Sequence, residues 1–76
     1  MSQYRDKKLL QKIAVILKEL RDEAGLIQAD VYDETKIHIG RIETAKANLS
    51  ISSLSVLCRY YKIPMSDFFK KVENLK

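Results

Sequence analysis

The stretch KIHIGRIETAK (residues 36–46) decides how the rest of the sequence is interpreted. We expect residues 38–45 to be helical. In a helix with about 100° between successive residues, Ile39 and Ile42 lie about 60° apart and form one inward-facing stripe. Arg41 then projects from the opposite face. The stretch therefore predicts a short helix that buries two isoleucines and presents an arginine to solvent.

Apolar residues recur at helical spacing on both sides of this stretch. A long first helix is predicted from about residue 5 to residue 24, and a short acidic helix over residues 27–34. Ser50 or Ser52 can cap the next helix, and a final helix is predicted over residues 65–75. No run alternates as a β-strand would, so the predicted class is all-α with about five helices.

Length and composition limit what the chain can be. Its 76 residues are enough for one core, so we expect residues 1–76 to form a single domain. The longest apolar run, residues 13–17, is far shorter than the ~20 residues that cross a membrane. A single cysteine excludes an internal disulfide, which is typical of a cytoplasmic protein. The net charge is +4, and residues 44–64 contain no acidic residue, which permits an acidic partner.

Metal binding and catalysis are not expected. His38 is the only histidine and Cys58 the only cysteine, and a metal site needs further ligands at compatible spacing. No Ser/His/Asp or Cys/His set has workable spacing and no glycine-rich phosphate loop is present, so the chain is not expected to be an enzyme or to hold a cofactor. Cys58 falls on the apolar stripe of a helix, and we expect it in the core.

Two residues of the opening stretch, Glu43 and Gly40, are unusual at their positions and need an explanation. Glu43 lies beside the inward stripe, where a carboxylate needs a partner. Arg21, at the inner edge of the first helix, can donate two parallel hydrogen bonds to it. We favour a partly buried pair over an ordinary surface pair. Gly40 costs about 1 kcal/mol relative to alanine inside a helix, and either a close approach of another backbone or tolerated drift accounts for it.

The order of these features resembles a known family. The segments ILKELRDEAGLIQADVY and IHIGRIETAKANLSISSLSVLCRYYKIPMSDFF are similar to the helix-turn-helix domain of Cro and Xre-like phage repressors and bacterial regulators. The resemblance covers about residues 13–69. It implies a lambda-repressor-like bundle of five helices, with the third helix in the DNA major groove. Arg21 and Glu43 match the family's structural ion pair. Gln28 lies closer to Glu43 than in the common pattern, so the turn between the second and third helices is shortened.

The resemblance also implies a set of residues that contact DNA. They are Gln28, Lys36, His38, Arg41, Thr44, Lys46 and Asn48. Arg41 matches a position that contacts base edges, and Gln28 one that touches phosphate and supports the third helix. Residues 44–48 match the turn that meets the DNA backbone. Lys36 and His38 fall in the shortened turn, where they can add a phosphate or base contact. The predicted function is sequence-specific binding of double-stranded DNA by a transcriptional regulator.

We expect the protein to act as a homodimer, because one such domain contacts few bases. The final helix supplies the candidates for the dimer seam: Met65, Phe69, Val72 and Leu75. Phe68 is assigned to the core of the monomer. These residues can alternatively all cover the bundle. A second candidate seam consists of Tyr4, Val15, Ile16 and Tyr60.

A protein partner is the alternative function. The second helix carries three acidic residues, Asp30, Asp33 and Glu34, which suit a basic partner. The chain would then be a protein-interaction module. An antitoxin, which binds both its toxin and its own operator, combines the two functions.

Overall fold

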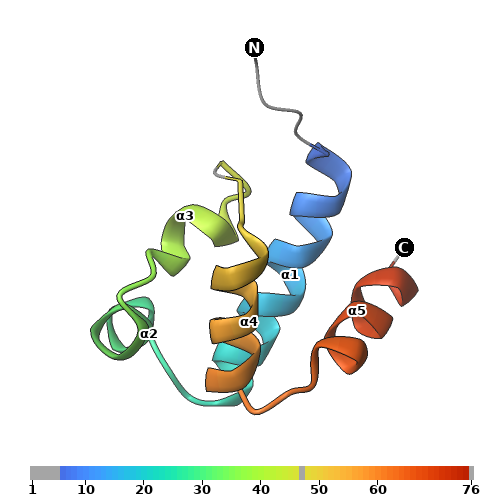
Figure 1. Ribbon diagram of the computed structural model, residues 1–76. Coiled ribbons are helices and arrows are strands. Elements are labelled where there is room, and N and C mark those ends of the chain that lie inside the picture. Colours follow the sequence, from blue (N-terminus) through green and yellow to red (C-terminus); the bar gives the residue numbers. More distant parts are fainter. Residues whose placement is uncertain (1–5, 47, 76) are drawn as a thin grey trace.

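The computed structural model describes residues 6–46 and 48–75, and they form five helices without a strand (Figure 1). The helices are α1 (Lys7–Glu23), α2 (Gln28–Thr35), α3 (Ile39–Glu43), α4 (Ile51–Tyr60) and α5 (Met65–Asn74). The predicted all-α class with five helices is confirmed. In the described part of the chain, no helix is long and apolar enough to cross a membrane.

Side-chain caps set where the first and fourth helices begin. The Asp6 carboxylate accepts a hydrogen bond from the Leu9 N–H at 3.0 Å, so α1 starts at Lys7 rather than near residue 5, which lies outside the described residues. Of the two serines that can cap α4, Ser50 does so, and its hydroxyl accepts from the Ser53 N–H at 3.0 Å. These caps satisfy backbone donors that a helix start leaves free.

Of the two helices of the helix-turn-helix, α3 is shorter than predicted and α2 is displaced by one residue. The helix expected over residues 38–45 is α3, which covers only Ile39–Glu43. His38 is its N-cap residue, and the left-handed φ of 58° at Ala45 prevents the helix from continuing. At the start of α2, the Asp30 carboxylate accepts from the Ile27 N–H at 3.0 Å. Ile27 is therefore the N-cap residue and α2 starts one residue later than predicted.

The core is built from all five helices around α1. Its fully buried apolar side chains are Leu17, Val31, Ile39, Leu54, Leu57, Cys58, Phe68 and Val72. Cys58 and Phe68 lie in the core as predicted. Val72 was predicted at the dimer seam, but it is only 2% exposed, so that assignment is wrong. Ile16, in the second candidate seam, is equally buried at 4%, and Tyr4 lies outside the described residues.

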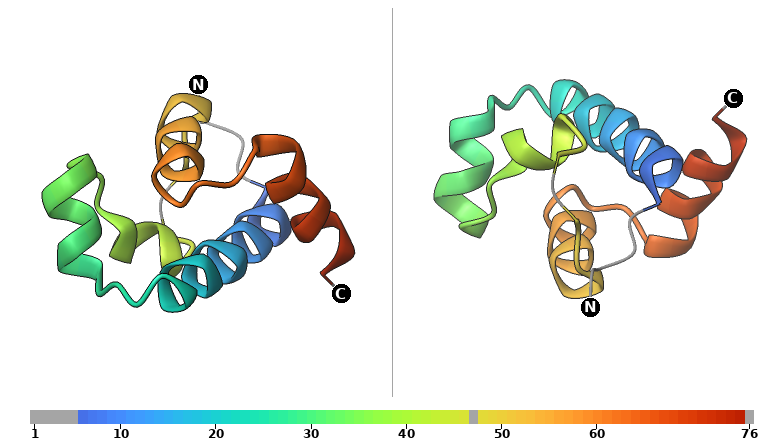
Figure 2. Two further views of the ribbon diagram at one scale, coloured as in Figure 1. Left: turned by 90° about the horizontal axis from the view of Figure 1, so that it is seen from below. Right: turned by 90° about the horizontal axis from the view of Figure 1, so that it is seen from above.

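α1 runs between the α2–α3 unit on one side and α5 on the other (Figures 1 and 2). α4 packs against both α2 and α5. The start of α1 and the chain that leaves α3 lie at the same end of the molecule (Figure 1). The two helices of the helix-turn-helix therefore form one side of the bundle, and α3 is supported from behind by α1.

Candidate nucleic-acid interface

Arg41 lies on the outer face of α3. Ile39 and Ile42 are buried against the core, whereas Arg41 is exposed. Within residues 6–46 and 48–75, its guanidinium makes no hydrogen bond or ion pair. Its five N–H donors are therefore free to meet a ligand. This is the arrangement that the opening stretch of the sequence predicts.

A buried ion pair joins α3 to α1. The Arg21 Nε donates to Glu43 Oε2 at 2.7 Å, and Nη2 donates to Oε1 at 3.0 Å. The two side chains are only 10% and 4% exposed. The third guanidinium nitrogen, Nη1, donates to the Leu26 carbonyl at 2.8 Å. The predicted, partly buried Arg21–Glu43 pair is thus present, and the hydrogen bond to Glu43 raises the pKa of Arg21 above its ordinary value.

Gln28 ties α2 to the same carboxylate. Its Nε2 donates to Glu43 Oε1 at 3.0 Å, so the first residue of α2 holds the last residue of α3. Its Oε1 lies 2.8 Å from the place that a Cβ on residue 40 would occupy. Gly40 is therefore explained by the Gln28 side chain, and not by the approach of another backbone. Arg21, Gln28 and Glu43 form one network that fixes α1, α2 and α3 relative to one another.

The Tyr61 hydroxyl lies near this network without joining it. It is buried and has no hydrogen-bond partner among the described residues. Burial raises the pKa of Tyr61 to about 12, and the charge of Glu43 adds to the effect while Arg21 opposes it. The Tyr61 side chain packs against the core, which buries the hydroxyl.

The shortened turn is held by an aromatic contact. Lys36 ends α2 in a left-handed conformation with φ of 60°, and its N–H donates to the Tyr32 carbonyl at 2.7 Å. The His38 ring stacks on the Tyr32 ring with centroids 4.5 Å apart, and Lys36 Nζ lies 5.7 Å from the same ring. The structure thus gathers Lys36 and His38 around Tyr32, a residue that the sequence analysis missed. A tyrosine one helical turn before Lys36 is the signal that could have identified it.

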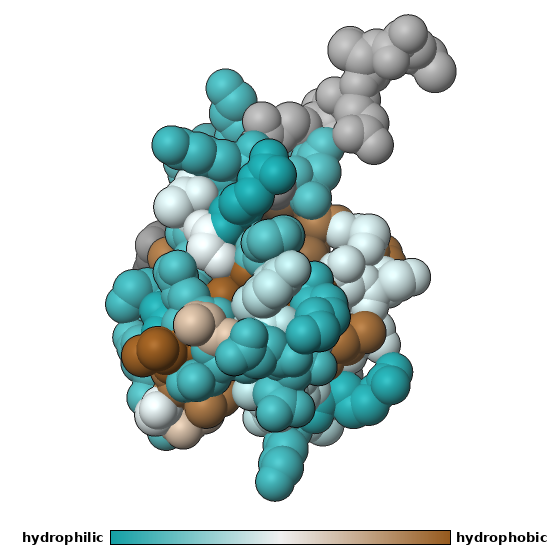
Figure 3. Space-filling view, turned by 90° about the vertical axis from the view of Figure 1, so that its left-hand side faces the viewer, coloured by the Kyte–Doolittle hydropathy of each residue, from teal (hydrophilic) through white to brown (hydrophobic). Residues whose placement is uncertain are grey.

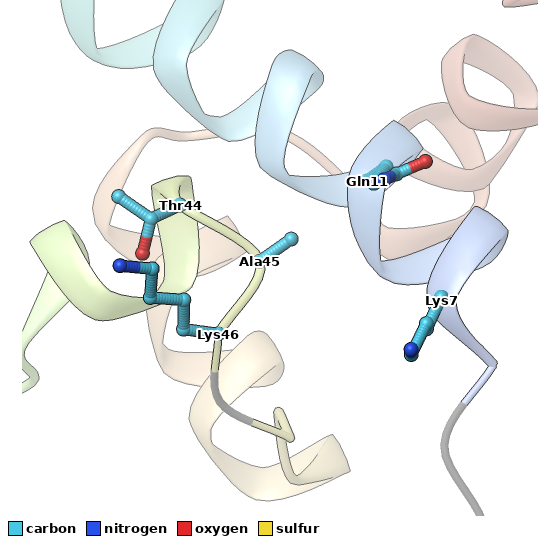
Figure 4. Close-up of a pocket in the computed structure, with 5 residues that line it drawn as sticks. All are labelled: Lys7, Gln11, Thr44, Ala45 and Lys46. Carbon is cyan, nitrogen blue, oxygen red and sulfur yellow. The ribbon is translucent and has the colours of Figure 1, made fainter.

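Two shallow clefts divide the predicted DNA-contacting residues. A cleft of about 350 Å³ between α2 and α3 is lined by Gln28, Tyr32, His38, Gly40 and Arg41, with Ala29 and Ile39 beneath them. A second cleft, of about 430 Å³, lies between α1 and the chain that leaves α3 (Figure 4). Its lining residues are Lys7, Gln11, Thr44, Ala45 and Lys46. Gln28, His38 and Arg41 are therefore together, Lys36 lies beside them, and Thr44 and Lys46 belong to the neighbouring cleft.

The chain that leaves α3 is exposed. The Thr44 hydroxyl donates to the Arg41 carbonyl at 3.0 Å, and the Lys46 N–H donates to the same carbonyl at 3.3 Å. Thr44, Lys46 and Asn48 are all exposed, but Asn48 lines neither cleft. Viewed from the side of α2 and α3, the surface is largely hydrophilic, and its hydrophobic areas are small and separated (Figure 3). This face suits a polar, wet partner better than an apolar one.

Two of the three acidic residues of α2 lie near α4. Asp30 and Glu34 are close enough to Tyr60 of α4 that, with burial as the main cause, they raise the pKa of that tyrosine. The described residues hold no group of His, Cys, Asp or Glu that could bind a metal ion.

Comparison with known proteins places this geometry in a family. The helix-turn-helix family profile matches residues 17–68. The restriction–modification controller protein C.Esp1396I, solved as a tetramer in complex with its natural 35 base-pair operator, is 28% identical, with a TM-score of 0.75 over 84% of this chain and 88% of that chain. A single-substitution mutant of the same controller protein is 27% identical, with a TM-score of 0.77 over 95% of this chain and 90% of that chain. No curated protein matches the chain. The fold, the buried Arg–Glu pair and the family match together assign the chain to the Cro/C1-type (Xre) family of helix-turn-helix DNA-binding domains.

Proposed function

We propose that this protein is a sequence-specific transcriptional regulator that binds double-stranded DNA with α3 in the major groove. One observation carries the proposal: an exposed arginine, which has no partner among the described residues, is held on a helix that a buried ion pair fixes in place. The similarity to a controller protein that was solved on its operator supports it.

Arg41 reads a base in this proposal. Its fork of donors can bond two acceptors of guanine, O6 and N7, at the floor of the major groove. At about 1.5 Å per residue, the five residues of α3 span only about 7.5 Å, so few side chains reach base edges. Tyr32 and His38 line the cleft next to Arg41 and are placed to meet the neighbouring base or phosphate. Lys36 adds a cation at the same end of α3.

Backbone contacts fix the register. Thr44, Lys46 and Asn48 are exposed directly after α3 and contact phosphates from there. Gln28 uses one N–H of its amide for Glu43, and the amide has a second N–H that can donate to a phosphate. In this proposal, Gln28 therefore links α3, through Glu43, to the DNA strand that α2 approaches.

A short reading helix requires a second copy for adequate specificity. The controller protein in the operator complex is a tetramer, and we propose that this chain forms at least a dimer. Met65, Phe69 and Leu75 of α5 are partly buried apolar residues that a partner can cover further. Sizing the protein at several concentrations, alone and with DNA, tests this assignment. A monomer in both conditions contradicts it.

The experiment is selection of bound sequences from a random duplex pool, followed by affinity measurements on Arg41→Ala. We expect Arg41→Ala to cost about 1–3 kcal/mol on the selected sequence and to relax discrimination at one base pair. Arg59→Ala is the matched control, because Arg59 is also an exposed helical arginine but lies on α4. Equal loss of affinity for selected and scrambled duplexes in Arg41→Ala contradicts the base contact.

A further inference from the structure

The cleft between α1 and the chain that leaves α3 is lined only by basic and uncharged residues. Lys7 and Gln11, one helical turn apart on α1, form one wall, and Thr44, Ala45 and Lys46 form the other (Figure 4). The lining contains two lysines and no carboxylate. Lys7 and Lys46 are exposed, and neither forms an ion pair within the described ranges.

Among the described residues, the half of α1 that borders the cleft carries no acidic residue, and Asp6 precedes it as the N-cap. α1 carries four lysines from Lys7 to Lys18 and no acidic residue in that interval. Its acidic residues other than the cap, Glu19, Asp22 and Glu23, lie in the second half of the helix. Asp6 accepts the Leu9 N–H and borders the groove on the α5 side of α1. Within residues 6–46 and 48–75, Lys7, Lys8 and Lys12 therefore form no ion pair.

Lysines in the first turn of a helix oppose the helix macrodipole. The first turn of α1 contains Lys7 and Lys8 and no acidic residue, an arrangement whose cost the Asp6 carboxylate at the N-cap offsets only in part. A bound anion removes that cost. The lysine placement is therefore costly in the isolated domain and favourable in a complex with a polyanion.

The cleft is continuous with the interface proposed above. Thr44 and Lys46 follow α3 directly, and the start of α1 lies at the same end of the bundle (Figure 1). A DNA strand whose phosphates meet Lys46 therefore passes the mouth of this cleft. Gln11 lines the same cleft as Lys7 but also borders a groove on the α5 side, and its amide points away from Thr44 and Lys46 (Figure 4).

We propose that Lys7 extends the phosphate contacts of the helix-turn-helix onto α1, so that the DNA backbone is held at the cleft between α1 and the chain that leaves α3. This inference rests on the proposed function and adds a contact that the helix-turn-helix itself does not contain. The contact is independent of base sequence, because only phosphate and sugar oxygens reach the lysine donor there.

The test is the salt dependence of duplex binding, measured by fluorescence anisotropy with wild type, Lys7→Gln, Lys7→Arg and Lys8→Gln. Loss of one phosphate contact reduces the slope of log K against log salt by about 0.9. We expect that reduction in Lys7→Gln and the wild-type slope in Lys7→Arg. Lys8→Gln makes the same charge change one residue away, but Lys8 borders the grooves on the α5 side, so its slope should stay that of wild type.

Two results overturn the inference while leaving the proposed function intact. One is an unchanged slope in Lys7→Gln, and the other is the same reduction in Lys7→Gln and Lys8→Gln, which indicates a general charge effect. If the wild type itself binds no duplex from the random pool at low salt, the proposed function fails and the inference fails with it. Helix content by circular dichroism confirms that each variant is folded.

Discussion

The buried ion pair allows a stability experiment with a magnitude worked from the structure. Glu43→Leu removes both hydrogen bonds that the Arg21 guanidinium makes to the carboxylate, at 2.7 and 3.0 Å. A guanidinium whose side chain is only 10% exposed is then left with the Leu26 carbonyl and with Asp22 at 3.6 Å. Breaking a buried pair from one side costs about 3–5 kcal/mol. A single core of this size supplies about the same free energy of unfolding, so we expect the free energy of unfolding of Glu43→Leu to be near zero at 25 °C, with about half of the protein unfolded.

The double variant separates the charge from the packing. Arg21→Met combined with Glu43→Leu removes both charges and keeps apolar volume, and such replacements are typically neutral or stabilising. We expect it to be folded, with a free energy of unfolding within about 1 kcal/mol of wild type. Lys18→Met is the control. It breaks a pair of similar length, 3.0 Å, whose side chains are 58% and 54% exposed, and it should cost less than about 1 kcal/mol.

The assay is urea unfolding followed by circular dichroism, with linear extrapolation to water. The reasoning is refuted if Glu43→Leu loses no more stability than Lys18→Met. It is also refuted if the double variant is as unstable as Glu43→Leu, because the cost would then come from lost packing and not from an unpaired buried charge.

Two further predictions concern stability alone. Tyr61→Phe should be neutral or stabilising by about 1–2 kcal/mol at pH 7, because it removes a buried hydroxyl without a partner among the described residues. The folded-state pKa of Tyr61, about 12, is above the ordinary value of about 10. Wild type should therefore lose about 2 kcal/mol of unfolding free energy relative to Tyr61→Phe as pH rises from 10 to 12, measured by urea titration at each pH. Ala45→Gly should raise the unfolding free energy by about 1 kcal/mol, because Ala45 has φ of 58°, and a lower midpoint of thermal unfolding would contradict this.

The helix pattern and the ion pair could be predicted from the sequence because each follows from a local rule. Ile39 and Ile42 define an inward face by spacing alone, and a carboxylate next to that face requires a cation such as Arg21. The position of Arg41 on the outer face follows from the same geometry. Asp6, an acidic residue before a predicted helix, could also have been recognised as an N-cap. The lysines that follow it are unfavourable at a helix start and argued against placing the start of α1 there.

Other features could not be predicted because they depend on how the helices come together. Helical periodicity does not distinguish a face that covers the bundle from a face that is free, so Val72 was assigned to the dimer seam. The contact of Tyr32 with His38 depends on the shortened turn, whose path the sequence does not specify. Three residues other than glycine, Lys36, Ala45 and Lys62, adopt the left-handed backbone conformation. Glycine is the residue that usually marks such a position, so the sequence did not indicate them.

The arrangement at Gln28 and Gly40 has an evolutionary consequence. One amide nitrogen holds the Glu43 carboxylate while the amide oxygen of the same side chain fills the space above residue 40. We therefore expect the two positions to be coupled, because a larger residue at 40 requires the end of the Gln28 side chain to move. Among relatives that keep this packing, the pair should change together, and lineages that lost the glutamine should be those in which the glycine was free to drift.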